Sequence, residues 1–183
     1  DRTDIGNWRP IGLQNTIGKV YSAVLAKRVT DWAISEGRLS RAQKGFLPFQ
    51  GCAEHNFLLQ TAIQDANRTG KSLSIAFLDL RNAFGSLPHS AILKSLEYLG
   101  LSQHAIFTLY ASFHGSTTRV KTRNGISGSI KMNSGVIQGS PLSPILFNLG
   151  IEPLLRAAAS ACRGYPLHTH KLASLAYADD VAL

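Results

Sequence analysis

Three aspartates stand where strand-like segments end, and they are the side chains of this sequence best suited to chemistry. Asp179 and Asp180 separate two apolar runs, 172–176 and 181–183, which predicts a hairpin with both carboxylates exposed at its tip. Asp79 ends a third strand-like run, 73–78. Three such carboxylates can hold a pair of divalent cations about 3.5–4 Å apart, an arrangement that supports in-line phosphoryl transfer. Taken alone, an Asp-Asp pair in a turn is more often a solvated turn.

A glycine- and serine-rich loop over 135–144 is the second candidate, because it runs into a helix expected over 144–161. Helix N-termini attract phosphate, and small residues let a ligand approach the backbone. Gly139 and Ser140 are therefore placed to lie against a nucleotide, and Gln138 offers an amide. An ordinary helix start, with Ser143 before Pro144, satisfies the same sequence.

The segment 117–134 is expected to form a basic hairpin, since Asn124-Gly125 is a strong hairpin signal. Period-two spacing on the strand before this turn sets three cations on one face: Arg119, Lys121 and Arg123. Such a ribbon suits a phosphate backbone, although the hairpin alone favours a solvated face. Arg9 is a further cation that could clamp phosphate oxygens or simply lie on the surface.

Helices, a strand and two hairpins must position these candidates. Apolar periodicity, caps and stops predict helices over roughly 16–36, 54–68, 88–99, 103–114 and 144–161. In the first of them an apolar stripe runs from Ile17 to Trp32, and Asn15 or Thr16 is the expected cap. With a strand over 73–79, this order is an α+β pattern built on an antiparallel sheet.

The composition describes a globular, strongly basic chain. Of its 183 residues, 44% are hydrophobic and 16% charged, and 19 Lys and Arg against 11 Asp and Glu give a formal charge of +8. This balance suggests nucleic acid or an anionic membrane as partner, and a generally basic soluble protein is the alternative. No run of 18 apolar residues and no signal peptide are visible, and two isolated cysteines suggest reduced thiols in an intracellular protein. The sequence is expected to be a piece of a longer protein.

Five short blocks, spread over nearly the whole chain, carry a resemblance to a known family. They are 7–13 continuing to 26–28, Gln43–Pro48, Phe77–Phe84, Gly135–Asn148 and Ala176–Asp180. In this order they resemble the reverse transcriptase domain of non-LTR (LINE-type) retrotransposons and, more distantly, that of group II introns. Gly85 is a departure, because many such domains carry an acidic residue there, and it bears on subfamily placement more than on activity.

The resemblance implies a role for each matching position. Asp79, Asp179 and Asp180 would be the catalytic carboxylates and metal ligands, assisted by the backbone carbonyl of Leu80. Phe84 would lie against the sugar 2′ position and favour deoxynucleotides. The remaining positions would contact the nucleotide or the nucleic acid: Arg9 the incoming triphosphate, Gln138 and Gly139 the nucleotide and templating base, Tyr177 the primer end, and Ser140, Pro141, Arg119, Lys121 and Arg123 the nucleic acid.

The resemblance also implies the architecture and the partners. It is that of a right-hand polymerase, with fingers over 1–72 and palm over 73–183, the basic hairpin included, and with a thumb that would follow residue 183. The truncated chain alone is expected to be inactive. Two Mg²⁺ ions, or Mn²⁺ in their place, an RNA template, a DNA primer or target, deoxynucleoside triphosphates and further domains of the same polypeptide are implied, with no membrane and with a nuclear location.

Three other functions fit parts of the sequence less well. A non-catalytic RNA-binding module would not need three carboxylates in a basic cleft. RNA-templated RNA polymerases usually carry Gly where Ala178 stands and lack the aromatic at Phe84. A membrane-surface protein would need a helix with a basic face and an exposed aromatic face, and no helix combines them.

Overall fold

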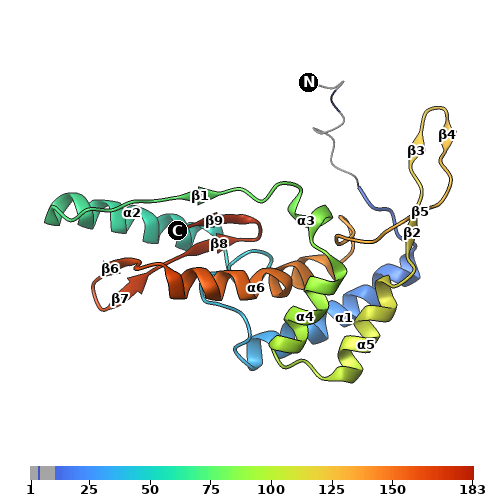
Figure 1. Ribbon diagram of the computed structural model, residues 1–183, viewed down its shortest axis with the longest axis horizontal. Coiled ribbons are helices and arrows are strands. Elements are labelled where there is room, and N and C mark those ends of the chain that lie inside the picture. Colours follow the sequence, from blue (N-terminus) through green and yellow to red (C-terminus); the bar gives the residue numbers. More distant parts are fainter. Residues whose placement is uncertain (1–3, 5–10) are drawn as a thin grey trace.

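The computed structural model describes residue 4 and residues 11–183, which fold into helices packed on a small antiparallel sheet (Figure 1). The helices are α1 (Thr16–Ser35), α2 (Cys52–Thr69), α3 (Ala83–Ser86), α4 (His89–Tyr98), α5 (Gln103–Phe113) and α6 (Ser143–Ala161). The strands are β1 (Phe77–Leu78), β2 (Thr117–Thr118), β3 (Lys121–Thr122), β4 (Gly125–Ile126), β5 (Ile130–Lys131), β6 (Tyr165–Leu167), β7 (His170–Leu172), β8 (Leu175–Tyr177) and β9 (Asp180–Ala182).

The predicted helices form where local signals placed them. Asn15 caps α1 by accepting the Gly18 N–H at 2.6 Å, and Ser102 caps α5 by accepting the Ala105 N–H at 3.4 Å. Gly70 ends α2 in the left-handed conformation. These contacts satisfy amide groups that a helix leaves unpaired at its ends, so they fix the boundaries from within a few residues of sequence.

The apolar stripe of α1 is buried only in its second half. Val29 and Ala33 are buried where α1 packs on α6, whereas Ile17 is 84% exposed. Val20, Tyr21 and Val24 are exposed as well. In α6, Leu155 is buried, whereas its apolar neighbour Leu154 is exposed. Helical periodicity therefore predicted these helices, but it did not predict which parts of their faces would be covered.

The main sheet has the order β1-β9-β8 and is antiparallel throughout. Ala176 of β8, Ala178 of the turn after it and Val181 of β9 join the main core. Helix α6 lies beside these strands (Figure 1) and adds Leu146, Phe147 and Leu149, which are buried. The strand expected over 73–79 is shorter than predicted. Regular pairing starts at Ala76, which exchanges both backbone hydrogen bonds with Leu183, and residues 73–75 have no strand partner among the described residues.

A second hairpin, β6–β7, was not predicted, and it joins the sheet region to α2. Its turn contains His168 with a φ of 52°, a conformation for which the residue type gives only a weak signal. Ala62 and Ala66 of α2 pack against Tyr165 and Leu167. The Tyr165 hydroxyl donates to Asp65 Oδ2 at 2.8 Å, and this bond, with one from Arg68, lowers the pKa of Asp65.

The basic hairpin forms one residue out of the expected register. Thr122 pairs with Gly125, so the turn is Arg123-Asn124 rather than Asn124-Gly125. The cause is local: the Thr122 hydroxyl accepts the Asn124 N–H at 3.2 Å and donates to the Gly125 carbonyl at 3.1 Å. Arg123 therefore lies in the turn, Lys121 lies in β3, and Arg119 lies between β2 and β3, so the three cations do not share one strand face as expected.

An ion pair with one buried partner, Glu152, and one partly exposed partner, Arg156, lies on α6 beside the loop after α1. Glu152 is fully buried, and its Oε1 accepts from Arg156 Nε at 2.9 Å, while its Oε2 has no hydrogen-bond partner among the described residues. Arg156 also donates to the Arg38 carbonyl at 2.9 Å. The hydrogen bond to the Glu152 carboxylate raises the pKa of Arg156, so the guanidinium stays charged across the ordinary pH range.

Arg156→Met is expected to destabilise the chain strongly. The methionine keeps most of the side-chain volume but leaves the Glu152 carboxylate buried without a cation, which costs roughly 3 kcal/mol. Thermal or urea unfolding of the variant measures this loss. The double variant Glu152→Leu with Arg156→Met should recover much of it, and equal stability of the single variant and the parent chain would contradict the prediction.

The described part of the chain contains no helix with the length and apolar character needed to cross a membrane. Cys52 is exposed and Cys162 half-buried, and both are free thiols.

Candidate active site

The acidic hairpin β8–β9 turns at Ala178-Asp179, because Tyr177 pairs with Asp180. Asp179 therefore lies half-buried in the turn, and Asp180 is the exposed first residue of β9, so only one of the two carboxylates sits at the tip. The prediction that both would be exposed there was wrong in this respect. The two-residue turn takes Ala178 to a φ of 55°, a conformation that non-glycine residues rarely adopt.

Asp79 reaches the same end of the sheet from the neighbouring strand. Leu78 pairs with Val181, and Asp79 follows Leu78 just as Asp180 precedes Val181. In an antiparallel register these two aspartates are therefore opposed, one step beyond the last paired residues of β1 and β9. Asp79 and Asp180 are both exposed, so the sheet presents two carboxylates to solvent with a third in the adjoining turn.

The donor set fits a hard divalent cation. Among residue 4 and residues 11–183, no group of three His, Cys, Asp or Glu side chains lies close enough together to hold a metal ion, so the structure does not bring the three aspartates together as one such group. Mg²⁺ in phosphoryl-transfer sites is usually bound through one or two carboxylates, with substrate phosphates and waters as the other ligands. The opposed carboxylates of Asp79 and Asp180 match that pattern, and a joint role for all three aspartates stays a prediction.

The Leu80 carbonyl already accepts a hydrogen bond within the chain. The Ala83 N–H donates to it at 3.1 Å, in the turn that leads into α3. A carbonyl oxygen has two lone pairs, so one remains for a further partner. The assisting role expected for Leu80 therefore stays a prediction.

A buried glutamine that sequence reasoning missed holds the acidic turn from the other side of β8. Gln43 is 1% exposed, and its Oε1 accepts the N–H groups of Gly45 and Ala178, each at 2.8 Å. Its Nε2 donates to the Ala178 carbonyl at 3.2 Å. The side-chain amide thus pairs with both backbone polar groups of Ala178, as a peptide unit of a neighbouring strand would.

The backbone on either side of Gln43 runs along β8 and forms hydrogen bonds with it. The Ala176 N–H donates to the Ala42 carbonyl at 2.8 Å, and the Lys44 N–H donates to the Ala176 carbonyl at 2.9 Å. From the α6 side, the fully buried Asn148 donates through Nδ2 to the Gly45 carbonyl at 2.7 Å. Segment 42–45 is therefore fixed between the acidic hairpin and α6.

Aromatic side chains form a wall that reaches Tyr177, the residue directly before the acidic turn. The half-buried ring of Phe84 stacks on the buried ring of Phe147, with centroids 4.4 Å apart. Phe46 meets Phe84 edge-on at 5.9 Å and the Tyr177 ring at 6.4 Å. Phe46, which the sequence did not single out, is 54% exposed, so the wall has an open side.

The loop before α6 is fastened to the segment that carries Phe84. The Val136 N–H donates to the Phe84 carbonyl at 2.7 Å, and the Gly135 N–H donates to the Leu87 carbonyl at 2.8 Å. These bonds bring the loop expected to border the nucleotide next to the aromatic expected to face its sugar. The two sequence blocks, separated by about fifty residues, therefore meet at one place.

Farther along this loop, Gln138 is half-buried, Gly139 and Pro141 are exposed, and Ser140 is buried. Gly139 has a φ of 112°, and a Cβ there would lie 2.7 Å from the Gly12 carbonyl oxygen, so the position requires glycine. The helix itself starts at Ser143, one residue earlier than expected. Ser143 is no cap, because its hydroxyl donates to the Ile137 carbonyl at 2.7 Å and the N-cap position is Leu142.

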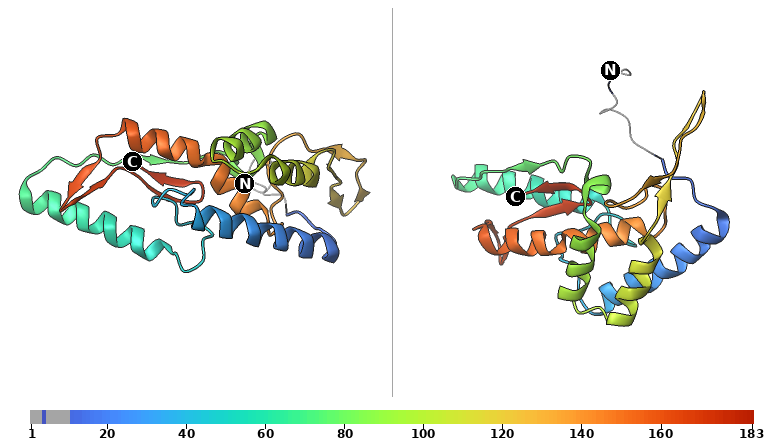
Figure 2. Two further views of the ribbon diagram at one scale, coloured as in Figure 1. Left: turned by 90° about the horizontal axis from the view of Figure 1, so that it is seen from below. Right: turned by 45° about the vertical axis from the view of Figure 1, so that its right-hand side comes forward.

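The structure does not bring the basic hairpin to the carboxylates. Residues 117–131 are exposed, and the hairpin projects from the body away from β8 and β9 (Figure 1, and Figure 2 from two further sides). Arg119, Lys121 and Arg123 are therefore free to meet a ligand far from the acidic turn. Arg9 lies outside the described residues.

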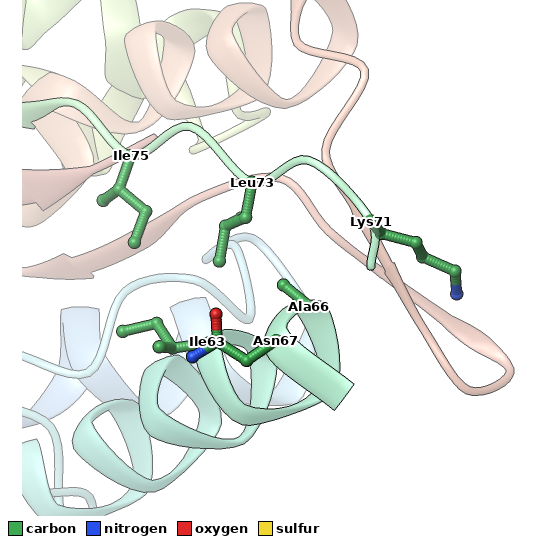
Figure 3. A pocket seen from close by; sticks show the side chains of 6 residues that line it. All are labelled: Ile63, Ala66, Asn67, Lys71, Leu73 and Ile75. Carbon is green, nitrogen blue, oxygen red and sulfur yellow. The ribbon is translucent and has the colours of Figure 1, made fainter. Parts of the chain in front are cut away.

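A hollow of about 390 Å³ lies elsewhere, between α2 and the extended segment 71–75 (Figure 3). Ile63, Leu73 and Ile75 face it, and Lys71 points away from it. The segment that lines it precedes β1, whereas Asp79 follows β1. The hollow is therefore separate from the acidic end of the sheet.

Ala178→Gly is expected to leave stability nearly unchanged and to preserve the hairpin. Glycine adopts positive φ without strain, which relieves about 1 kcal/mol, but the change also removes a buried methyl group and gives the unfolded chain more freedom, which together cost about as much. Thermal unfolding of the variant measures the net effect. A decrease in stability of more than about 2 kcal/mol would show that the turn does not need a positive φ at this position.

Comparisons with known proteins agree with this geometry. Residues 1–183 match the family described as "Reverse transcriptase (RNA-dependent DNA polymerase)". The chain is 32% identical over 185 residues to the Pol polyprotein of the type-1 retrotransposable element R2 of Popillia japonica, covering 100% of the chain and 26% of that protein. It is 31% identical over 177 residues to the R2DM Pol polyprotein of Drosophila melanogaster, covering 97% of the chain and 16% of that protein.

The fold also has solved counterparts. The apo telomerase of Candida tropicalis superposes with a TM-score of 0.58 at 16% identity, covering 92% of this chain and 31% of that one. A Candida albicans telomerase gives a TM-score of 0.54 at 12% identity, covering 91% and 30%. These similarities confirm the expected α+β right-hand polymerase fold. The chain spans about a quarter or less of the curated relatives named above.

Proposed function

Because the chain belongs to the reverse transcriptase family, with R2 and other non-LTR retrotransposon proteins among its relatives, we propose that its parent protein copies RNA into DNA during retrotransposition. One observation carries this proposal: Asp79 and Asp180 are opposed at one end of an antiparallel sheet, with Asp179 in the adjoining turn. An RNA-binding module would have no use for that charge arrangement.

The three aspartates would hold two divalent cations, Mg²⁺ or Mn²⁺, against the incoming triphosphate. Bound cations would neutralise the charge that develops during transfer and lower the barrier at the primer hydroxyl. The chain's own contribution is to fix the carboxylates at one end of the sheet, since phosphoryl transfer depends mainly on positioning and electrostatics. Asp180 is the first residue of β9 and Asp79 follows β1, which pairs with β9, so backbone hydrogen bonds next to both residues constrain their relative position.

The aromatic wall supports selection of deoxynucleotides. Phe84 is backed by the stacked ring of Phe147, so it cannot recede to admit a 2′-hydroxyl. Gln138 and Gly139 would border the base pair, and the backbone bond between Val136 and Phe84 holds their loop beside the aromatic ring. Tyr177 would lie near the primer end, because it immediately precedes the acidic turn.

The nucleic acid would extend from this site over the rest of the protein. Arg9 would contact the triphosphate, and Ser140 and Pro141 the template. Arg119, Lys121 and Arg123 on the projecting hairpin would contact the phosphate backbone at a distance from the carboxylates. Residues 1–72 would serve as fingers and 73–183 as palm, with further domains of the polypeptide supplying the rest. Action on chromosomal target DNA would place the protein in the nucleus.

The test is nucleotide incorporation by the parent protein extended through its thumb. A primed RNA template with Mg²⁺ is supplied with deoxynucleotides or with ribonucleotides. Efficient deoxynucleotide incorporation that Asp79→Asn eliminates would establish reverse transcription, and Phe84→Val should raise ribonucleotide incorporation at least about tenfold relative to deoxynucleotides. Binding of the template without synthesis of either product would reject the proposal in favour of a non-catalytic RNA-binding role.

A further inference from the structure

The acidic turn needs an external support that its own hairpin does not provide. β8 and β9 pair over three residues each, and the turn follows at once with Ala178 at a φ of 55°. Ala178 is only 2% exposed, so its N–H and carbonyl groups cannot be solvated. Buried backbone groups must find partners within the protein, and any residue that supplies them controls the turn's conformation.

Gln43 supplies both partners with one side chain. Its Oε1 accepts the Ala178 N–H at 2.8 Å, and its Nε2 donates to the Ala178 carbonyl at 3.2 Å. The same oxygen accepts the Gly45 N–H at 2.8 Å, which orients the amide. Only an amide of this length offers an acceptor and a donor in the required order, since a carboxylate accepts at both oxygens.

Rigid structure holds Gln43 in place. Its neighbours Ala42 and Lys44 bond to Ala176, two residues before Ala178, and Asn148 of α6 bonds to Gly45. Segment 42–45 is thus hydrogen-bonded to β8 on one side and to α6 on the other. Because Gln43 is held in this way, its side-chain amide can restrict the conformation of the backbone that bears Asp179 and Asp180.

We propose that Gln43 is a positioning residue for DNA synthesis: by pairing with both polar groups of Ala178, it sets the orientation of the Asp179 and Asp180 carboxylates. The inference rests on the proposed function of those aspartates. Gln43 itself is buried, and its side-chain hydrogen bonds go to Ala178 and Gly45, so it acts on the aspartates through the backbone. Displacing catalytic groups by about 1 Å can lower a rate by roughly 100-fold, so loss of this support should appear in the rate of chemistry.

The experiment uses the full-length protein with Gln43→Leu, Gln43→Glu and, as matched control, Ser95→Ala. Ser95 is also buried and donates to one backbone carbonyl, that of Gly150 at 3.1 Å, but it links α4 to α6 away from the aspartates. Single-turnover incorporation is measured against Mg²⁺ and primer–template concentration, and amide hydrogen exchange is followed in the peptide that contains 175–183. Thermal unfolding of each variant records its loss of stability.

Gln43→Leu is expected to lower the incorporation rate roughly 10–100-fold and to raise the Mg²⁺ concentration for half-maximal rate, with primer–template affinity unchanged. Exchange should accelerate in peptide 175–183 for this variant and not for Ser95→Ala. Gln43→Glu should regain activity as the pH falls, because the protonated carboxyl can again donate to the Ala178 carbonyl. The parent protein and Ser95→Ala should show no such gain in activity at lower pH.

Two results would overturn the inference. One is a Gln43→Leu protein that is folded and less stable, like Ser95→Ala, but has the parent's rate and Mg²⁺ requirement. The other, decisive if Gln43→Leu fails to fold, is a Gln43→Glu protein with the parent's pH profile and exchange. A parent protein that binds primer–template but incorporates no nucleotide would instead reject the proposed function, so the two failures are distinguishable.

Discussion

Asp179→Asn is expected to abolish DNA synthesis by the full-length protein while leaving its fold intact. Asparagine matches the size of aspartate and keeps one acceptor oxygen, but it removes the charge that would bind the cations. Losing a ligand of this kind costs several kcal/mol in the transition state, which corresponds to a rate loss of roughly 1,000-fold or more. Stability should be nearly unchanged, because asparagine and aspartate have almost the same size and the position is only half-buried.

Single-turnover extension of a primed RNA template measures the rate, and thermal unfolding measures stability. Asp31→Asn is the matched control, because Asp31 is an exposed aspartate on α1 that pairs with Lys27 at 2.7 Å. It makes the same chemical change on a different surface and should leave synthesis at the parent level. Retained synthesis by Asp179→Asn, or its failure to fold, would contradict the assignment of the acidic turn.

Gly45→Ala is expected to be the most destabilising single methyl addition to this region. A Cβ at Gly45 would overlap the Ala178 backbone nitrogen and lie 2.9 Å from the Ala178 Cα and 3.0 Å from Gln43 Oε1. Segment 42–45 would have to separate from β8, which breaks the backbone bonds to Ala176. Overpacking combined with lost hydrogen bonds should cost about 3 kcal/mol or more.

Urea unfolding of Gly45→Ala measures that cost. Gly128→Ala is the control, since a Cβ at Gly128 meets no atom within 4 Å and its φ is not in the positive range. Its stability should change by no more than about 0.5 kcal/mol. If both variants unfold at the same urea concentration, β8 and segment 42–45 do not pack as closely as described.

The features that sequence predicted well depend on neighbouring residues. Asn15 and Ser102 cap helices through amides three residues away, and Gly70 ends α2 by its own backbone conformation. The acidic hairpin is equally local, since its strands are joined by two residues. Asp79 was placed with it because a strand-like run ended there and because the five blocks resembled a known family.

The features that sequence did not predict depend on distant partners or on competition within a turn. Nothing near Gln43 indicates that its amide will be buried against Ala178, because the contact joins residues 135 apart. The exposed half of the α1 stripe has the same periodicity as the buried half, and only α6 distinguishes them. At the basic hairpin, the two hydrogen bonds of the Thr122 hydroxyl favour a turn at Arg123-Asn124, one residue before the Asn-Gly turn that the sequence predicted.

The pairing of segment 42–45 with β8 has a consequence for synthesis of the protein on the ribosome. Gln43 is translated 135 residues before Ala178, which at about 5–20 residues per second is an interval of roughly 7–27 s. During that interval the emerging chain carries an open backbone edge at 42–45 and an amide without its partner. The acidic turn therefore acquires this support only after β8 has emerged, and a chaperone that binds extended segments would find segment 42–45 available until then.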